Sequence, residues 1–126
     1  INTQRIDSFD YDLDTGRIGN RRTLIEIPVS MGSPDGMCVD AEGGIWVALW
    51  GGGSVIRIVD SKIVKIIEIP TPQVTSVAFV GADLDQLVIT TASIGLKEQQ
   101  DGAGNLYIYP TNTSGKQANR IGNWIS

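Results

Sequence analysis

The tetrapeptide Ile-Glu-Ile-Pro occurs twice in this chain of 126 residues, at 25–28 and at 67–70, an offset of 42 positions. Further segments recur at comparable offsets and share a pattern of apolar residues at alternate positions. They align as 35–39 with 75–79, 46–48 with 88–90, and 55–58 with both 6–9 and 106–109. Agreement among several segments makes chance a poor explanation. A period of about 40 residues is typical of architectures that stack copies of one supersecondary unit.

Each repeat consists of short segments rich in Val, Ile and aromatic residues, separated by Gly, Asp and Pro, without a helical period. The expected strands are 4–12, 22–27, 36–40, 45–50, 54–59, 63–69, 75–80, 86–91 and 105–109, and in the tail 119–125. Short strands that repeat every ~40 to 45 residues indicate the blades of a β-propeller. The sequence therefore predicts an all-β fold, a partial β-propeller of about two to three blades. We expect one partial domain, 1–126, with blade pieces at about 1–30, 31–70 and 71–126.

A closed propeller needs about four or more blades, so this number of blades would leave strand edges and a hydrophobic blade face uncovered. Such surfaces pair readily with another chain. The chain is therefore expected either to be incomplete or to associate with a second copy of itself.

Composition excludes several classes of protein. Hydrophobic residues make up 41% and charged residues 19% of the chain, which favours a packed globular fold over disorder. The net charge of −4 and the absence of a basic run argue against nucleic acid as a partner. No apolar stretch reaches the roughly 20 residues that span a bilayer, so no membrane partner is expected. The single cysteine, Cys38, cannot form an internal disulfide, and we expect a reducing, cytoplasmic location.

The chain contains no histidine, which excludes Ser-His-Asp, Cys-His and His-rich zinc sites within it. Any metal would have to be held by oxygen ligands, a preference of hard ions such as calcium. Asp35 is the candidate ligand, although Pro34-Asp35-Gly36 is also a favoured turn sequence whatever the function. On turn chemistry alone, the structural interpretation of Asp35 is the better one.

Other acidic and glycine-rich segments have simpler interpretations than a ligand site. Asp10, Asp12 and Asp14 alternate as in a calcium loop, but the glycine and glutamate that such a loop requires are missing. They are expected to be strand residues and turn formers. The glycines at 51–53 precede a strand rather than a helix, so they predict a hairpin turn and not a phosphate loop. Asp40 is expected to accept backbone N–H bonds in a blade turn.

Four further residues have expected roles that follow from their place on the expected strands. Cys38 is expected in the core, because cysteine is among the most buried residue types. Trp46 is expected to pack between blades, and Trp50, near its strand end, is a weaker candidate for lining a channel mouth. Ser93 is a candidate substrate contact at the end of a strand, followed by a candidate lid at 94–104.

Two long segments carry a resemblance to a known family. FDYDLDTGRIGNRR at 9–22 and SPDGMCVDAEGGIWVALWGGGSVIRI at 33–58 resemble the regucalcin/SMP-30, gluconolactonase and luciferin-regenerating enzyme family. The segments 75–93 and 103–109 are similar to its final blade. The resemblance covers nearly the whole chain, but only the carboxy-terminal half of that family, whose members are six-bladed propellers.

This resemblance implies a metal-dependent hydrolase of sugar lactones or related esters. It implies one divalent ion, calcium or zinc, at the top of the central channel, with Asp35 as a metal ligand that also serves as a catalytic base. The family's glutamate and asparagine ligands and its substrate-binding arginine belong to regions that would precede Ile1. Activity is therefore expected only once the propeller is completed, by a missing amino-terminal half or by a second copy. The alternative is a non-catalytic binding or assembly module that self-associates through exposed strand edges.

Overall fold

Nine β-strands and one short 3-10 helix form the part of the chain that the computed structural model describes, residues 3–96 and 101–117. The elements are β1 (Arg5–Tyr11), β2 (Ile18–Glu26), η1 (Val29–Met31), β3 (Ser33–Val39), β4 (Ile45–Trp50), β5 (Ser54–Val59), β6 (Lys62–Glu68), β7 (Val74–Val80), β8 (Gln86–Thr91) and β9 (Leu106–Pro110). All nine strands expected within these ranges are confirmed, although β2 starts four residues and β3 three residues earlier than predicted. The strand predicted at 119–125 lies outside the described residues. No helix of the described part is long and apolar enough to cross a membrane.

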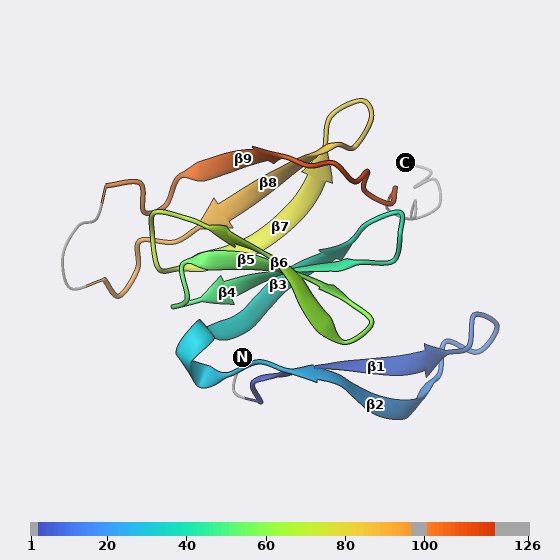
Figure 1. Ribbon diagram of the computed structural model, residues 1–126. Helices are drawn as coiled ribbons and strands as arrows, with labels where there is room; N and C mark the ends of the chain where they lie inside the picture. Colours follow the sequence, from blue (N-terminus) through green and yellow to red (C-terminus); the bar gives the residue numbers. More distant parts are fainter. Residues whose placement is uncertain (1–2, 97–100, 118–126) are drawn as a thin grey trace, which may run out of the picture.

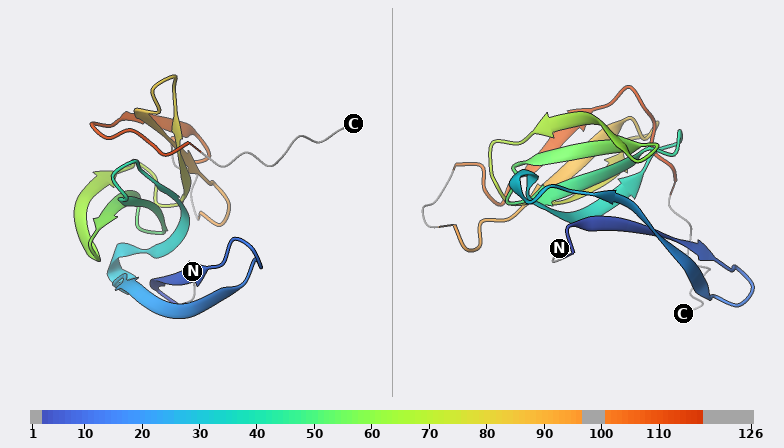
Figure 2. Two further views of the ribbon diagram at one scale, coloured as in Figure 1. Left: turned by 90° about the vertical axis from the view of Figure 1, so that its right-hand side faces the viewer. Right: turned by 60° about the horizontal axis from the view of Figure 1, so that its bottom comes forward.

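The strands form three separate antiparallel sheets in chain order, with neighbours in sequence paired in space (Figure 1). We call them the first sheet (β1-β2), the middle sheet (β3-β4-β5-β6) and the third sheet (β7-β8-β9). The end at which β3 and β7 begin and β4 and β8 finish is called the upper end, and the opposite end, where β3 and β7 finish, is called the lower end. Figure 2 shows the sheets following one another along an arc, with β3 and β7 on its concave side. This arrangement is the predicted all-β, partial propeller.

Strand β4, in the interior of the middle sheet, is buried on both faces, and this explains its unbroken apolar sequence. Successive side chains of a strand point to opposite faces. Val47 and Leu49 therefore pack toward the first sheet, against Ile6 and Ile27. Trp46 and Ala48 pack on the opposite face. All four β4 residues are at most 1% exposed.

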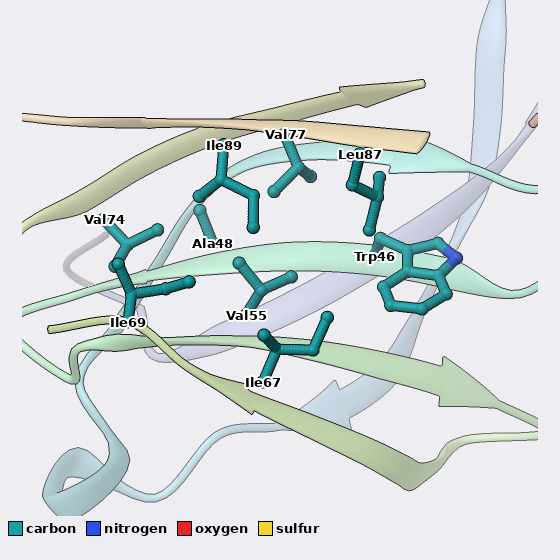
Figure 3. Close-up of a cluster of buried hydrophobic side chains, with 9 residues drawn as sticks. All are labelled: Trp46, Ala48, Val55, Ile67, Ile69, Val74, Val77, Leu87 and Ile89. Carbon is teal, nitrogen blue, oxygen red and sulfur yellow. The ribbon is translucent and has the colours of Figure 1, made fainter. Parts of the chain in front are cut away.

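A cluster of nine buried side chains joins the middle sheet to the third sheet (Figure 3). Its members are Trp46, Ala48, Val55, Ile67, Ile69, Val74, Val77, Leu87 and Ile89. Trp46 also contacts the ring of Phe79 edge-to-face, with ring centroids 6.1 Å apart. Aromatic pairs of this geometry add about 0.5–1.5 kcal/mol to the burial term. The expectation that Trp46 packs between blades is confirmed.

The far face of the third sheet lacks such a cover among the described residues. Leu106 and Ile108 on β9 are 68% and 65% exposed. They alternate with Tyr107 and Tyr109, which pack against the buried cluster that joins the middle and third sheets. One side of β9 is thus packed, and the other presents apolar side chains to solvent.

Pro34-Asp35-Gly36 is not a turn, which corrects the interpretation from local sequence. The three residues lie within β3, where Pro34 pairs with Leu49 and Met37 pairs with Val47. Two residues, Asp35 and Gly36, thus stand opposite the single residue between Val47 and Leu49, which makes a β-bulge. Proline is compatible with this position because β3 is an edge strand of its sheet.

Glycine is required at position 36 because β7, the strand beside β3 on the concave side of the arc, approaches its backbone closely. A Cβ atom placed there would lie 2.6 Å from Cβ and 2.8 Å from Cα of Ser76 on β7. Real Cβ atoms do not approach other heavy atoms so closely, so any side chain would force β3 and β7 apart.

We therefore expect Gly36→Ala to lower the free energy of unfolding by about 2 kcal/mol, the usual cost of overpacking. Gly19→Ala is the matched control, because no atom lies within 4 Å of the added Cβ in β2. Urea denaturation of both variants measures the difference. Equal stability of the two variants would contradict the close approach of β3 and β7.

Candidate functional site

Asp35 lies at the bulge of β3, near the upper end of this strand. Strand β3 itself runs along the concave side of the arc (Figure 2). Bulges re-aim side chains and are frequent next to active sites. Its side chain is half-buried, and none of the ion pairs among the described residues involves it. Asp35 is thus a carboxylate without a cationic partner in the described structure, held on an inner strand.

Neutral polar groups surround the upper ends of β3 and β7. Gln4 Nε2 donates a hydrogen bond of 2.7 Å to Ser33 Oγ, two residues before Asp35. The Trp50 main chain pairs with Ser33 and also forms a bridge to Gln73. The side-chain oxygens Gln4 Oε1 and Gln73 Oε1 are buried without a hydrogen-bond partner in the described structure. The upper ends of β3 and β7 therefore carry amide and hydroxyl groups in addition to the carboxylate of Asp35.

Trp50 and Ser93 are the other residues predicted near the mouth of the central channel, and the structure gives their burial and strand position but no contact that tests a role. Trp50 is half-buried at the end of β4, and Ser93 is exposed just after β8. Lys97 and Glu98 of the segment proposed as a lid, 94–104, lie outside the described residues. A substrate contact by Ser93 and a mouth-lining role for Trp50 both remain predictions.

The described residues do not by themselves form a metal site. No group of three or more His, Cys, Asp or Glu side chains within the described ranges could hold an ion. Zinc usually takes four ligands and calcium about six to eight oxygens. Asp35 fits one oxygen position of such a site, and the remaining ligands would have to come from elsewhere.

Asp40, five residues after Asp35, accepts hydrogen bonds at both of its carboxylate oxygens. Its residue is 1% exposed, and its Oδ1 accepts bonds from the main-chain N–H of Gly44 at 2.8 Å and Glu42 at 3.0 Å. These two bonds confirm the predicted turn carboxylate. Its Oδ2 also accepts bonds from Trp46 Nε1 at 2.9 Å and Arg57 Nε at 2.8 Å, which the sequence did not predict.

Arg57 connects Asp40 to a second carboxylate and to the indole ring. Its Nη2 lies 2.7 Å from Glu42 Oε2, and its guanidinium lies 5.7 Å from the centroid of Trp46. Burial acts to raise the pKa of Asp40, but the hydrogen bonds from Arg57, Trp46 and Gly44 together hold it below its ordinary value of 3.8. Asp40 is therefore a structural anion of the lower turn. The contact between Asp40 and Arg57 spans 17 residues of sequence, so no local pattern predicts it.

Cys38 is only partly buried, which modifies the expectation of a core position. It packs against the edge of the buried cluster that joins the middle and third sheets. Burial, and secondly the charge of Asp40, raise the pKa of the Cys38 thiol to about 11. A thiol with this pKa is protonated at neutral pH and is a poor nucleophile.

The aspartates of the first sheet have the structural roles that were predicted. Asp12 Oδ1 accepts hydrogen bonds from the main-chain N–H of Asp14 at 2.9 Å and Thr15 at 3.0 Å in the turn after β1. Asp10 pairs with Arg22 across the sheet, at 2.6 Å. The glycines at 51–53 form the hairpin turn between β4 and β5, as expected.

Comparison with known proteins assigns the family. Residues 2–93 match the family described as SMP-30/Gluconolactonase/LRE-like region. The chain belongs to this family. Regucalcin of Xenopus laevis is 40% identical over 109 residues, which are 82% of this chain and 36% of that protein. The family predicted from the sequence is thereby confirmed.

Solved structures agree with this assignment. The luciferin-regenerating enzyme matches with a TM-score of 0.79 and 35% identity, over 90% of this chain and 40% of that one. Regucalcin from Agrobacterium tumefaciens, described as a calcium-binding protein, matches with a TM-score of 0.83 and 30% identity, over 91% of this chain and 41% of that one. The chain spans little more than a third of the length of the curated regucalcins it matches.

Loss of the Asp40 charge should destabilise the fold. Asp40→Asn leaves Arg57 without its buried partner, so we expect the free energy of unfolding to fall by about 3 kcal/mol at pH 7. Because the folded-state pKa of Asp40 is below 3.8, its stabilising effect is complete above the unfolded value and disappears as the pH falls through the lower folded value. Urea denaturation from pH 7 to pH 2.5 should therefore show the two proteins converging below about pH 4. An Asp60→Asn control, in the exposed β5–β6 turn, should match the wild type throughout.

Cys38 should resist alkylation. With a pKa of about 11 against the ordinary 9.0, its thiolate fraction at pH 8 is about 100-fold lower than that of an unperturbed thiol. We expect iodoacetamide to label the native chain correspondingly slowly and the urea-unfolded chain at the ordinary rate, measured by mass spectrometry. Equal rates in the two states would contradict the raised pKa.

Proposed function

We propose that this chain supplies the Asp35-bearing inner strand of a metal-dependent lactonase, which acts on small lactones of sugar acids. The proposal depends above all on one observation, the half-buried Asp35 at the bulge of β3, a strand that runs along the concave side of the arc. Membership of a family whose description includes gluconolactonase supports the reaction class. The calcium binding stated for the Agrobacterium tumefaciens relative supports a divalent ion.

In this proposal Asp35 has two tasks. It supplies one oxygen ligand to the ion, and it accepts a proton from the water that attacks the lactone carbonyl. A bound divalent ion would polarise that carbonyl and lower the pKa of the water. The bulge fixes the direction of the carboxylate, and Gly36 allows β7 to lie directly beside it. Arg57 and Asp40 take no part in the chemistry, because they satisfy each other at the lower end.

The proposal includes completion of the propeller by further blades. The exposed apolar side chains of β9 and the incomplete ligand set both support this requirement within the described residues. The further blades could belong to an additional segment of chain or to a second copy.

A second candidate function is a non-catalytic assembly module. It is favoured by the absence of three clustered acidic, Cys or His side chains among the described residues. In this case the exposed face of β9 would be the functional surface, and Asp35 would only shape the bulge.

The Asp35→Asn variant separates the two candidates. The assembled species of the wild type, Asp35→Asn and the Asp60→Asn control would each be purified and titrated with calcium and zinc by calorimetry. Hydrolysis of glucono-δ-lactone would be followed by proton release. We expect Asp35→Asn to lose at least about tenfold in ion affinity, with hydrolysis reduced in parallel, and the control to match the wild type.

Two results would decide against the lactonase. Unchanged ion affinity and hydrolysis in Asp35→Asn would show that this carboxylate has no role in either. A wild-type assembly that binds neither ion and hydrolyses no lactone would favour the assembly module.

A further inference from the structure

The segment after β9 lies at the lower end, where β9 finishes, and connects the middle sheet to the third sheet (Figure 1). Ala41 N donates to Ser114 O at 2.8 Å, and Lys116 N donates to Val39 O at 3.3 Å. Gly115 N donates to Leu84 O at 2.7 Å, in the turn between β7 and β8. The segment therefore bridges the lower turns of two neighbouring sheets.

A cavity of about 500 Å³, open to solvent, adjoins this bridge. It is lined by Cys38, Val39, Ala78, Phe79, Leu84, Lys116 and Gln117. This volume is within the range of small-molecule sites, roughly 300–1,000 Å³. The lining comes from β3, β7, the β7–β8 turn and the bridging segment. Asp35 is not part of it, since Val39 is the last residue of β3 and Asp35 lies at the bulge near its start.

The wall of the cavity is apolar, and its Phe79 ring is held by contacts on two sides. Phe79 contacts the buried Trp46 ring edge-to-face. Gly115 passes directly over the Phe79 ring, and a Cβ atom at 115 would lie 2.6 Å from Phe79 Cδ2. Val39 is 43% exposed, and it lies at the cavity rather than in the buried clusters. A ligand with an apolar body would cover these side chains.

Lys116 determines the charge of a suitable ligand. It is the single formally charged side chain at neutral pH among the lining residues, and none of the ion pairs of the described residues involves it. Asp40, close enough to raise the pKa of Cys38, is already bonded to Arg57. An anionic group beside Lys116 would gain a charge-assisted hydrogen bond.

We propose that this cavity is a second binding site, for a small carboxylate with an apolar body such as a medium-chain alkanoate. The alkyl chain covers Val39, Phe79 and Leu84, and the carboxylate accepts a hydrogen bond from Lys116 Nζ. The site is independent of the proposed lactone chemistry, because it uses the other end of the inner strands.

A charge series of ligands with one chain length tests this proposal. Octanoate, 1-octanol and octylammonium would be titrated into the isotopically labelled protein, and amide shifts followed by NMR. We expect octanoate to bind tightest and octylammonium weakest, with shifts concentrated at Cys38, Ala78, Leu84 and Lys116. Shifts concentrated instead at the exposed face of β9, or equal affinity for the three ligands, would overturn the assignment.

Substitutions separate the contribution of the Lys116 charge to binding from that of the apolar cavity wall. Lys116→Gln should weaken octanoate binding by about fivefold and leave octanol binding unchanged, as for a solvent-exposed ion pair. Lys62→Gln, an exposed lysine at the start of β6, is the matched control and should change neither. Ala78→Leu, at an exposed wall position, should fill the cavity and weaken both ligands. An unchanged octanoate affinity in both Lys116→Gln and Ala78→Leu, with folding verified by circular dichroism, would refute the site.

Discussion

The burial of both faces of β4 is the constraint on which the rest of the structure depends. Val47 and Leu49 face the first sheet, while Trp46 and Ala48 face the third sheet. Each large aliphatic side chain so buried contributes about 1.5–3 kcal/mol. A strand of this kind has to be covered on both sides, because its sequence offers no polar face to water. The neighbouring sheets, their order along the arc and the position of the inner strands all follow from this requirement.

The sequence predicted this architecture well because the repeat preserves the alternation of side chains. Val47 and Ile89, which the repeat places at equivalent positions, each pack toward the preceding sheet. A shift of one residue would have reversed every side chain. Local turn chemistry was the misleading signal at Pro34-Asp35-Gly36, since pairing with β4 overrides the turn preference of these residues. The contact between Asp40 and Arg57 could not be predicted, because it depends on how two strands meet rather than on any local pattern.

Asp35 in β3 and Asp40 just after β3 differ in their contacts, and this difference separates a structural role from a proposed chemical one. Asp40 accepts four hydrogen bonds, and the one from Arg57 is also an ion pair, so its charge is balanced within the fold. Asp35 stands at a bulge on the concave side and has no ion-pair partner among the described residues. The sequence identified both as candidates with a turn role. The ligand role proposed for Asp35 depends on this difference between the two aspartates.

The most direct test of this account is a methyl NOE spectrum of the chain with labelled Ile, Leu, Val and Ala side chains. The account predicts cross-peaks from Val47 and Leu49 to Ile6 and Ile27, and from Ala48 and Val55 to Ile89 and Val74. Cross-peaks between Ala48 and Ile6, or between Leu49 and Ile89, would contradict it. They would mean that β4 does not separate two neighbouring sheets, and the position of Asp35 on an inner strand would lose its basis.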